Sequence, residues 1–134
     1  MPNTEEYNEL LKELFGDNLG ENSMVMAPIA GAAFDHIKIG NNVKIGAGCL
    51  IMDSNFHSLD YLKRRNRSTD SLNAKREAVT IDDDVFIDAR CIVGKGVHIG
   101  ARTIIASGSV VVNDLPSDCI AGGNPCKIIK RLDL

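Results

Sequence analysis

Aliphatic side chains recur with a period of six residues through most of this chain. The recurring positions are Ile39, Ile45 and Ile51, followed after a gap by Ile81, Ile87, Val93, Ile99, Ile105 and Val111. Four residues after most of them stands a small or β-branched residue: Val43, Cys49, Val85, Cys91, Val97, Thr103 and Ser109. Leu, Ile and Val make up only 34 of the 134 residues, so nine coincidences in one register are not a chance pattern. The chain therefore contains a true short repeat.

A hexapeptide period is typical of a parallel β-helix. Three short strands of about six residues form one triangular coil, and stacked coils pair through their backbones. The large aliphatic residue fills the interior, and the small residue fits where the wall turns inward. Gly or Asp often follows the aliphatic, where we expect it to ease the corner through a positive φ or a side-chain-to-backbone bond. We predict an all-β fold, a left-handed parallel β-helix of about four coils, with Cys49 and Cys91 as buried, inert thiols.

The chain is predicted to be one domain, because 134 residues bury a single core. Residues 1–20 are expected to form an N-terminal helix region, and residues 25–115 a β-helix that a loop at residues 58–78 interrupts. Residues 116–134 are expected to form a C-terminal tail with a short helix. The first helix should begin at Asn3, with Glu6 completing a capping box, and should end at Gly16. The second should be a short basic helix near the end of the tail.

The interrupting loop carries no hexad and has a net charge of its own. It holds six cations against three acids, a local balance of +3 in a chain whose net charge is −3. A loop of this length within a compact domain is uncommon and is usually functional. We expect either a solvated flap or a segment that contacts a ligand.

Composition excludes several classes of protein. The net charge of −3 gives the chain no affinity for polyanions, so no nucleic-acid partner is expected. No apolar run approaches the ~20 residues that a membrane span requires. The acidic N-terminus is unlike a signal peptide, and the four cysteines lack metal-ligand spacing. We expect a reduced, cytoplasmic protein with no metal site.

Three motifs together resemble the hexapeptide-repeat acyltransferases, in the branch of maltose, galactoside and polysaccharide O-acetyltransferases. They are Asn55-Phe56-His57-Ser58-Leu59-Asp60, the segment from Val79 to Ile87, and Gly123-Asn124-Pro125-Cys126-Lys127-Ile128-Ile129-Lys130. The resemblance implies an acetyltransferase that moves an acetyl group from acetyl-CoA to a hydroxyl of a sugar or polysaccharide precursor. It also implies a homotrimer with active sites between neighbouring prisms.

The resemblance also implies site residues. His57 corresponds to the catalytic histidine, and a neutral imidazole is a suitable base for a sugar hydroxyl that attacks a thioester. Ala89 corresponds to the residue whose backbone N–H stabilises the oxyanion. The positions implied for CoA binding are Phe86, Ala89, Ser107, Val112, Asn113, Lys127, Lys130 and Arg131. His36 and His98 are expected to have no catalytic role.

The sequence departs from the family pattern at some of these positions. Phe86 stands where Trp is usual, Asp88 where Gly is usual, and Val112-Asn113 where Thr-Lys is common. The asparagine that holds the acceptor hydroxyl in some relatives has no clear counterpart.

Three alternatives remain for the function. An N-acyltransferase acting on an amino sugar or small amine would need the same fold and base. A non-catalytic β-helix scaffold would need only the prism. A zinc-dependent β-helical carbonic anhydrase would need three histidines on adjacent coils, two of them close together, whereas His36, His57 and His98 are widely separated and no two share a coil.

Overall fold

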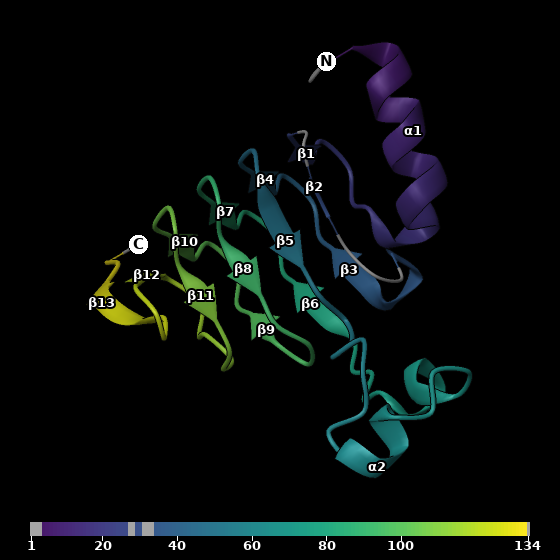
Figure 1. Cartoon of the computed structure of the whole chain (residues 1–134). Coiled ribbons are helices and arrows are strands. Elements are labelled where there is room, and N and C mark those ends of the chain that lie inside the picture. The colour runs from purple at the N-terminus through teal and green to yellow at the C-terminus, as the bar shows by residue number, and fades with distance from the viewer. Residues whose placement is uncertain (1–3, 27–28, 31–33, 134) are drawn as a thin grey trace.

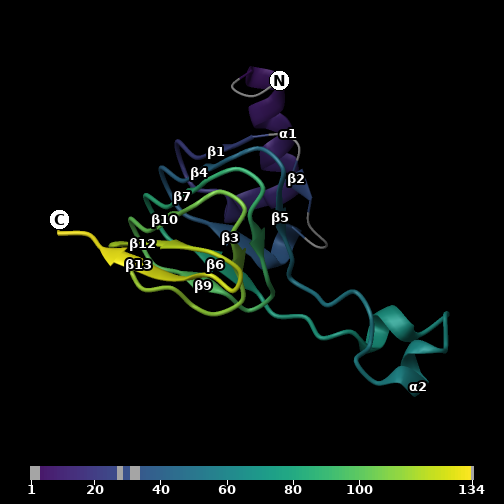
Figure 2. The same ribbon diagram turned by 60° about the vertical axis from the view of Figure 1, so that its left-hand side comes forward.

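The hexad repeat folds as a three-sided stack of parallel strands. A computed structural model describes residues 4–26, 29–30 and 34–133. One side is a six-stranded sheet, in the order β1 (Met24–Val25), β4 (Lys44–Ile45), β7 (Phe86–Ile87), β10 (Ile104–Ile105), β12 (Cys119–Gly122) and β13 (Lys127–Arg131). The second is a four-stranded sheet of β2 (Ile29–Ala30), β5 (Cys49–Ile51), β8 (Ile92–Val93) and β11 (Val110–Val111). The third is a three-stranded sheet of β3 (Ile37–Ile39), β6 (Val79–Ile81) and β9 (His98–Ile99). The strands follow one another up the stack in Figure 1, and Figure 2 shows the coils as nested loops.

The pairing register follows the repeat. Ile87 pairs with Ile105, which stands three hexads later in the chain. Ile45 pairs with Ile87 across a much longer stretch of sequence, because the interrupting loop lies within that coil. The predicted parallel β-helix is therefore confirmed, since all strand pairs except β12–β13 are parallel.

The core lies inside the prism, where the hexads predicted it. All nine recurring aliphatic residues are at most 2% exposed. The seven small or β-branched residues of the second series are buried as well. Each strand thus directs its aliphatic residue inward and its neighbours outward, as the alternation of side chains along a strand requires.

The glycines after the aliphatics have a different role from the one expected. Positive φ angles occur three residues after the aliphatic, for example at Gly48 (φ 76°) and Arg90 (φ 57°). Gly40, Gly46 and Gly100 instead lack a side chain because the next coil is too close: a Cβ on Gly46 would lie 2.7 Å from the backbone N of Ala89. The prediction of positive φ at these positions was wrong, and close packing between coils is the reason for glycine there.

Helix α1 (Glu5–Phe15) covers the first coil. Its N-cap is Thr4, whose side chain accepts a hydrogen bond from the backbone N–H of Tyr7. The prediction of Asn3 as the cap, with Glu6 completing a capping box, was therefore wrong, and Asn3 itself lies outside the described residues. Leu11 and Phe15 are buried on its inner face, and Gly16 ends the helix with a φ of 57°. A 3₁₀ turn, η1 (Gly16–Asn18), follows. No helix in the described ranges combines the length and the apolar character that crossing a bilayer demands.

The predicted C-terminal helix is wrong, because the segment forms strand β13. Lys127–Arg131 pairs antiparallel with β12, with a bulge between Ile120 and Ala121. Backbone pairing along the last coil gives this segment hydrogen bonds that the sequence pattern alone does not reveal. Ile128 and Ile129, expected to pack as a helix face, are 41% and 67% exposed.

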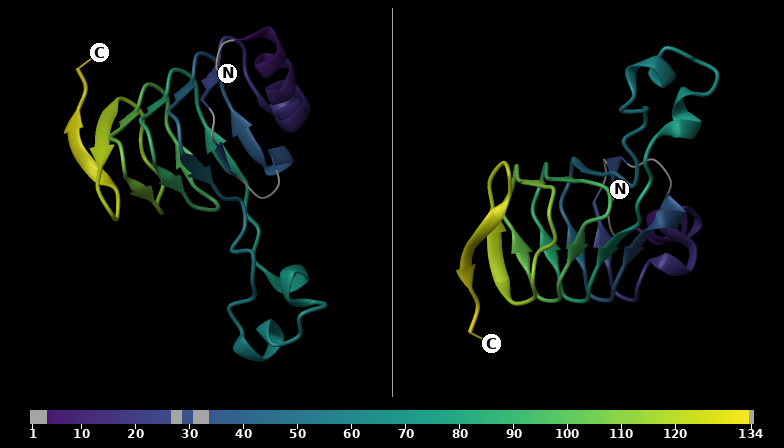
Figure 3. Two further views of the ribbon diagram at one scale, coloured as in Figure 1. Left: turned by 45° about the horizontal axis from the view of Figure 1, so that its top comes forward. Right: turned by 90° about the horizontal axis from the view of Figure 1, so that it is seen from below.

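The interrupting loop projects from the corner between β5 and β6. It contains a single α-turn, α2 (Tyr61–Arg64), and a 3₁₀ turn, η3 (Asp70–Asn73). A further 3₁₀ turn, η2 (Phe34–His36), precedes β3. Figure 3 shows from two directions that the loop extends away from the prism.

Candidate active site

The two sides of the loop are joined where it leaves the prism. Ser54 forms an antiparallel bridge with Arg76, and the N–H of Glu77 donates to the carbonyl of Asp53 at 2.9 Å. The N–H of Asn55 donates to the carbonyl of Lys75 at 3.0 Å. His57 comes two residues after Asn55, the last residue of this two-stranded neck. The neck therefore fixes the position of the His57 backbone relative to the prism.

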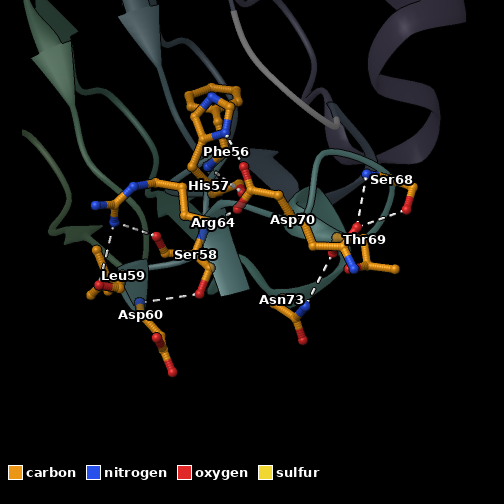
Figure 4. Close-up of polar contacts among 12 residues, drawn as sticks. Phe56, His57, Ser58, Leu59, Asp60, Arg64, Ser68, Thr69, Asp70 and Asn73 are labelled. Atoms are coloured by element: carbon orange, nitrogen blue, oxygen red, sulfur yellow. Dashed lines mark hydrogen bonds and ion pairs between the residues drawn. The ribbon is translucent and has the colours of Figure 1, made fainter. Parts of the chain in front are cut away.

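Within the loop, His57 is held by a buried carboxylate. The Nδ1 atom of His57 lies 2.6 Å from Oδ2 of Asp70, and the other oxygen, Oδ1, accepts the N–H of Ser58 at 2.8 Å. The Asp70 side chain is 10% exposed, whereas the His57 side chain is 68% exposed. Figure 4 shows Asp70 reaching across the loop to His57 and Ser58.

These contacts determine which nitrogen of His57 is free. The N–H of Ser58 and the hydrogen bond from His57 lower the pKa of Asp70, with nearby Arg64 contributing. Asp70 is therefore a carboxylate at neutral pH and can only accept hydrogen bonds, so Nδ1 of His57 carries the proton. In the neutral ring, Nε2 is then the basic atom, and the arrangement can accept a proton from a hydroxyl.

Asp70 was not among the residues predicted for the site. It appears in the sequence only as one of the loop acids, well separated from His57. No spacing rule links two residues across an irregular loop, since the α2 and η3 turns between them set the distance. The signal that could have found it is indirect: a catalytic histidine commonly has a carboxylate that orients its ring.

The second predicted element, Ala89, lies in the turn between β7 and β8. The N–H groups before and after it donate to neighbouring coils, from Asp88 to the Ile105 carbonyl and from Arg90 to the Ala47 carbonyl, both at 2.9 Å. The N–H of Ala89 instead donates to Oδ1 of Asp88 at 2.7 Å. The N–H of Ala89 therefore takes no part in the hydrogen bonding between coils.

Buried thiols support this turn from inside the prism. Sγ of Cys49 donates to the carbonyl of Asp88 at 3.2 Å, and Sγ of Cys91 donates to the carbonyl of Ala106 at 3.1 Å. Hydrogen bonding with Cys49 and burial raise the pKa of Cys91 well above its usual range. All four cysteines are free and buried, so Cys49 and Cys91 occupy the inward positions predicted for them.

Apart from the half-buried Ala89, the residues predicted to bind CoA are exposed, but they do not all lie together. Ser107 stacks on Ala89, as the carbonyl of Ala89 accepts the N–H of Gly108 at 3.0 Å. Phe86 precedes the same corner on the outer face of β7. Val112 and Asn113 follow β11 at the next corner, where the loop of the earlier coil departs.

The three basic residues of β13 are spread along that strand. Lys127 pairs with Gly122, close to the Ala89 corner, whereas Lys130 and Arg131 pair with Ile120 and Cys119 at the opposite end of β12.

Within one chain, His57 and Ala89 belong to different corners of the prism. His57 lies in the loop between the four-stranded and three-stranded sheets, and Ala89 lies between the six-stranded and four-stranded sheets. The loop points away from the coils in each view of Figure 3. A single copy therefore presents the two predicted functional groups at separate places.

Known proteins share this fold and about a third or less of the sequence when most of the chain is aligned. The family model "Bacterial transferase hexapeptide (six repeats)" matches residues 78–113. The crystal structure of the hexapeptide-repeat containing acetyltransferase VCA0836 from Vibrio cholerae superposes with a TM-score of 0.77 and 32% identity, over 96% of this chain and 81% of that one. The chain belongs to the hexapeptide-repeat acetyltransferases.

Two further relatives lie in one branch of these acetyltransferases. A maltose O-acetyltransferase from Clostridium difficile 630 has a TM-score of 0.78 and 27% identity, covering 98% of this chain and 78% of that one. The galactoside O-acetyltransferase of Escherichia coli (strain K12) is 28% identical over 96% of this chain and 70% of its own length. Some other curated relatives, among them a 2,3,4,5-tetrahydropyridine-2,6-dicarboxylate N-acetyltransferase of Clostridium perfringens, match only about 40% of this chain, in a stretch that covers 22–28% of their own length.

For this hexapeptide-repeat acetyltransferase, if His57 is the base, replacing Asp70 by Asn should lower kcat by roughly 10²- to 10⁴-fold. The amide can still accept the Ser58 N–H, but its NH₂ group faces Nδ1 and favours the tautomer with the proton on Nε2, which cannot act as a base. Steady-state CoA release at saturating substrate measures the effect.

Asp60→Asn is the matched control for Asp70→Asn. Asp60 lies in the same loop, where its side chain caps α2 through the N–H of Leu62, and Asn is an equally good cap. Equal losses in the two variants would mean that loop stability, and not the tautomer of His57, explains the result.

Proposed function

We propose that this acetyltransferase moves the acetyl group of acetyl-CoA to a hydroxyl of a sugar or polysaccharide precursor. The observation that carries the proposal is the exposed His57 ring, whose Nδ1 is held by Asp70 at 2.6 Å and whose Nε2 is left basic. A sugar hydroxyl is a poor nucleophile until a base takes its proton during the attack. The structure of VCA0836 in complex with acetyl coenzyme A, 31% identical with a TM-score of 0.72, supports acetyl-CoA as the donor.

In this proposal the reaction needs no covalent enzyme intermediate. Nε2 of His57 accepts the hydroxyl proton as the oxygen attacks the thioester carbonyl. The backbone N–H of Ala89 donates to the oxygen that becomes negative. The tetrahedral intermediate then collapses: the C–S bond breaks, the leaving sulfur takes the proton from Nε2 of His57, and CoA leaves as the free thiol while the acetyl ester remains.

Because His57 and Ala89 lie at different corners, the complete site is proposed to form between two copies of the chain. Two of the three outer faces carry apolar residues: Phe86, Ile104 and Ile120 on the six-stranded sheet, and Leu50, Ile92 and Val110 on the four-stranded sheet. The outer face of the three-stranded sheet carries Lys38, Thr80 and His98 instead. Two different apolar faces on one prism favour head-to-tail contacts, which close into a ring.

The chain is therefore expected to form a homotrimer. Sedimentation should give three times the chain mass of 14.5 kDa at micromolar concentration, since two apolar faces that are only partly buried in one copy are usually covered by a partner. A stable monomer with full activity would contradict both the trimer and the shared site.

Lys130→Ala is expected to raise the KM for acetyl-CoA by about 3- to 10-fold and to leave kcat nearly unchanged. Lys130 is exposed on β13 and is proposed to meet a CoA phosphate, a contact made equally in the ground and transition states. Initial rates at varied acetyl-CoA separate the two constants. Lys38→Ala, on the outer face of the three-stranded sheet, is the control and should change neither. A loss of kcat with an unchanged KM would place Lys130 elsewhere in the mechanism.

The experiment that tests the proposed function is CoA release from acetyl-CoA over a panel of sugars, alcohols and amines. Release with sugars and not with amines supports O-acetylation. Release only with amines would favour the N-acyltransferase alternative, and no release with any acceptor would favour the non-catalytic scaffold.

A further inference from the structure

Asp88, at the corner between β7 and β8, is a charged residue whose counterparts in the neighbouring coils are small. These stacked positions form a column along the corner. The register that pairs Ile45, Ile87 and Ile105 places Gly46 and Ala106 beside Asp88 in the coils before and after it. Neither neighbour has a side chain larger than a methyl group. The half-buried Asp88 side chain therefore has no bulky side chain beside it from either residue at the same position of the neighbouring coils.

Three stacked turns at this corner can be compared within the same molecule. They present the N–H groups of Ala47, Ala89 and Ser107, each directly after the column of Gly46, Asp88 and Ala106. Within the described ranges, the N–H of Ala89 has a hydrogen-bond partner, Oδ1 of Asp88 at 2.7 Å, and those of Ala47 and Ser107 have none. The carboxylate of Asp88 is thus what distinguishes the middle turn.

We infer that Asp88 is an internal competitor for the oxyanion position at Ala89, and that its side chain must rotate away before acetyl transfer. This inference rests on the proposed function, in which the Ala89 N–H receives the thioester oxygen. The Oδ1 atom at 2.7 Å occupies the place that an oxyanion bonded to this amide would take, because both are negative oxygens accepting the same donor. Asp88 therefore limits turnover.

Both the position of Asp88 and its negative charge oppose the reaction. Negative charge develops on the thioester oxygen as the acceptor attacks. A carboxylate that remained at the Ala89 amide would exclude this oxygen, and one that stayed close by would repel it. Rotation of the Asp88 side chain away from Ala89 moves the carboxylate off the amide, and neither Gly46 nor Ala106 carries a side chain long enough to block that rotation.

Amide hydrogen exchange, followed by NMR on the free protein, tests the contact itself. Exchange at Ala89 should be about 10- to 100-fold faster in Asp88→Ala than in wild type, since a hydrogen bond to a charged group is lost. Exchange at Arg90, whose N–H donates to Ala47, should stay the same and reports that the turn is intact. Unchanged exchange at Ala89 with an intact turn would overturn the inference, whatever the activity.

Turnover with acetyl-CoA tests the consequence. Asp88→Ala should raise kcat by about tenfold, and Asp88→Asn, which keeps an uncharged acceptor, should raise it less. The matched control is Asp82→Ala, at the same hexad position of another corner, where the carboxylate contacts Nε2 of His98 at 2.8 Å. Its kcat should equal that of wild type.

The possible failures are distinguishable. An unchanged or lower kcat in Asp88→Ala, with faster exchange at Ala89, would overturn Asp88 as a competitor while the acetyltransferase proposal stands. No CoA release by wild type with any acceptor would count against the proposed function. Faster exchange at Ala89 would then still establish that Asp88 holds this amide.

Discussion

Replacing His57 by Ala is expected to lower kcat by about 10²- to 10⁴-fold, the usual contribution of a positioned general base. The KM for acetyl-CoA should change little, because in the proposed reaction the imidazole meets the acceptor hydroxyl and not the CoA arm. Its side chain is 68% exposed, so the substitution leaves no cavity in the core. CoA release at saturating acetyl-CoA and acceptor measures the loss.

His98→Ala is the matched control for this experiment. Nε2 of His98 also lies beside a carboxylate, at 2.8 Å from Asp82, but on the outer face of the three-stranded sheet. Its kcat should stay within about twofold of wild type. Near-normal turnover in His57→Ala on the true acceptor would remove the loop from the mechanism and would leave the fold assignment untouched.

The second large effect is on folding. Ile39→Asp places an unpaired carboxylate inside the prism, where Ile39 is 2% exposed, at a cost of several kcal/mol. A domain of this size is stable by only about 5–15 kcal/mol. We expect the melting temperature to fall by more than about 10 °C, with loss of soluble protein.

Lys38→Asp is the control, because it introduces the same side chain at the adjacent residue on the outer side of the strand. Its stability should change by less than about 0.5 kcal/mol. Thermal unfolding followed by circular dichroism measures both variants. Equal shifts would mean that the assignment of inward and outward positions along β3 is wrong.

The prism could be predicted from the sequence because every hexad places a large aliphatic residue at the same inward-facing position. Each coil repeats the same cross-section, so a position such as Ile87 has the same environment as Ile105, and the pattern is visible without long-range information. Helix α1 was predictable for a similar reason, since its apolar spacing and Gly16 are local signals.

What could not be predicted depends on contacts between distant residues. Residues Lys127–Arg131 form a strand and not a helix because they pair with β12, and this pairing overrides the local helical spacing of their apolar residues. The partner of His57 depends on how two short turns fold the loop back. The hydrogen bond from Ala89 to Asp88 is local, but the sequence shows only that Asp stands there and not where its carboxylate points.

The two ends of the stack have a consequence for how this protein behaves in concentrated solution. Parallel coils could in principle continue from one molecule to the next, as strands do in a fibril. Helix α1 covers the first coil, and β13 reverses direction on β12 and bears Lys127, Lys130 and Arg131 along the outermost strand. An incoming parallel coil meets the wrong strand polarity and a row of positive charges. At the C-terminal end, the edge of the six-stranded sheet is thereby made a poor template for adding another parallel coil.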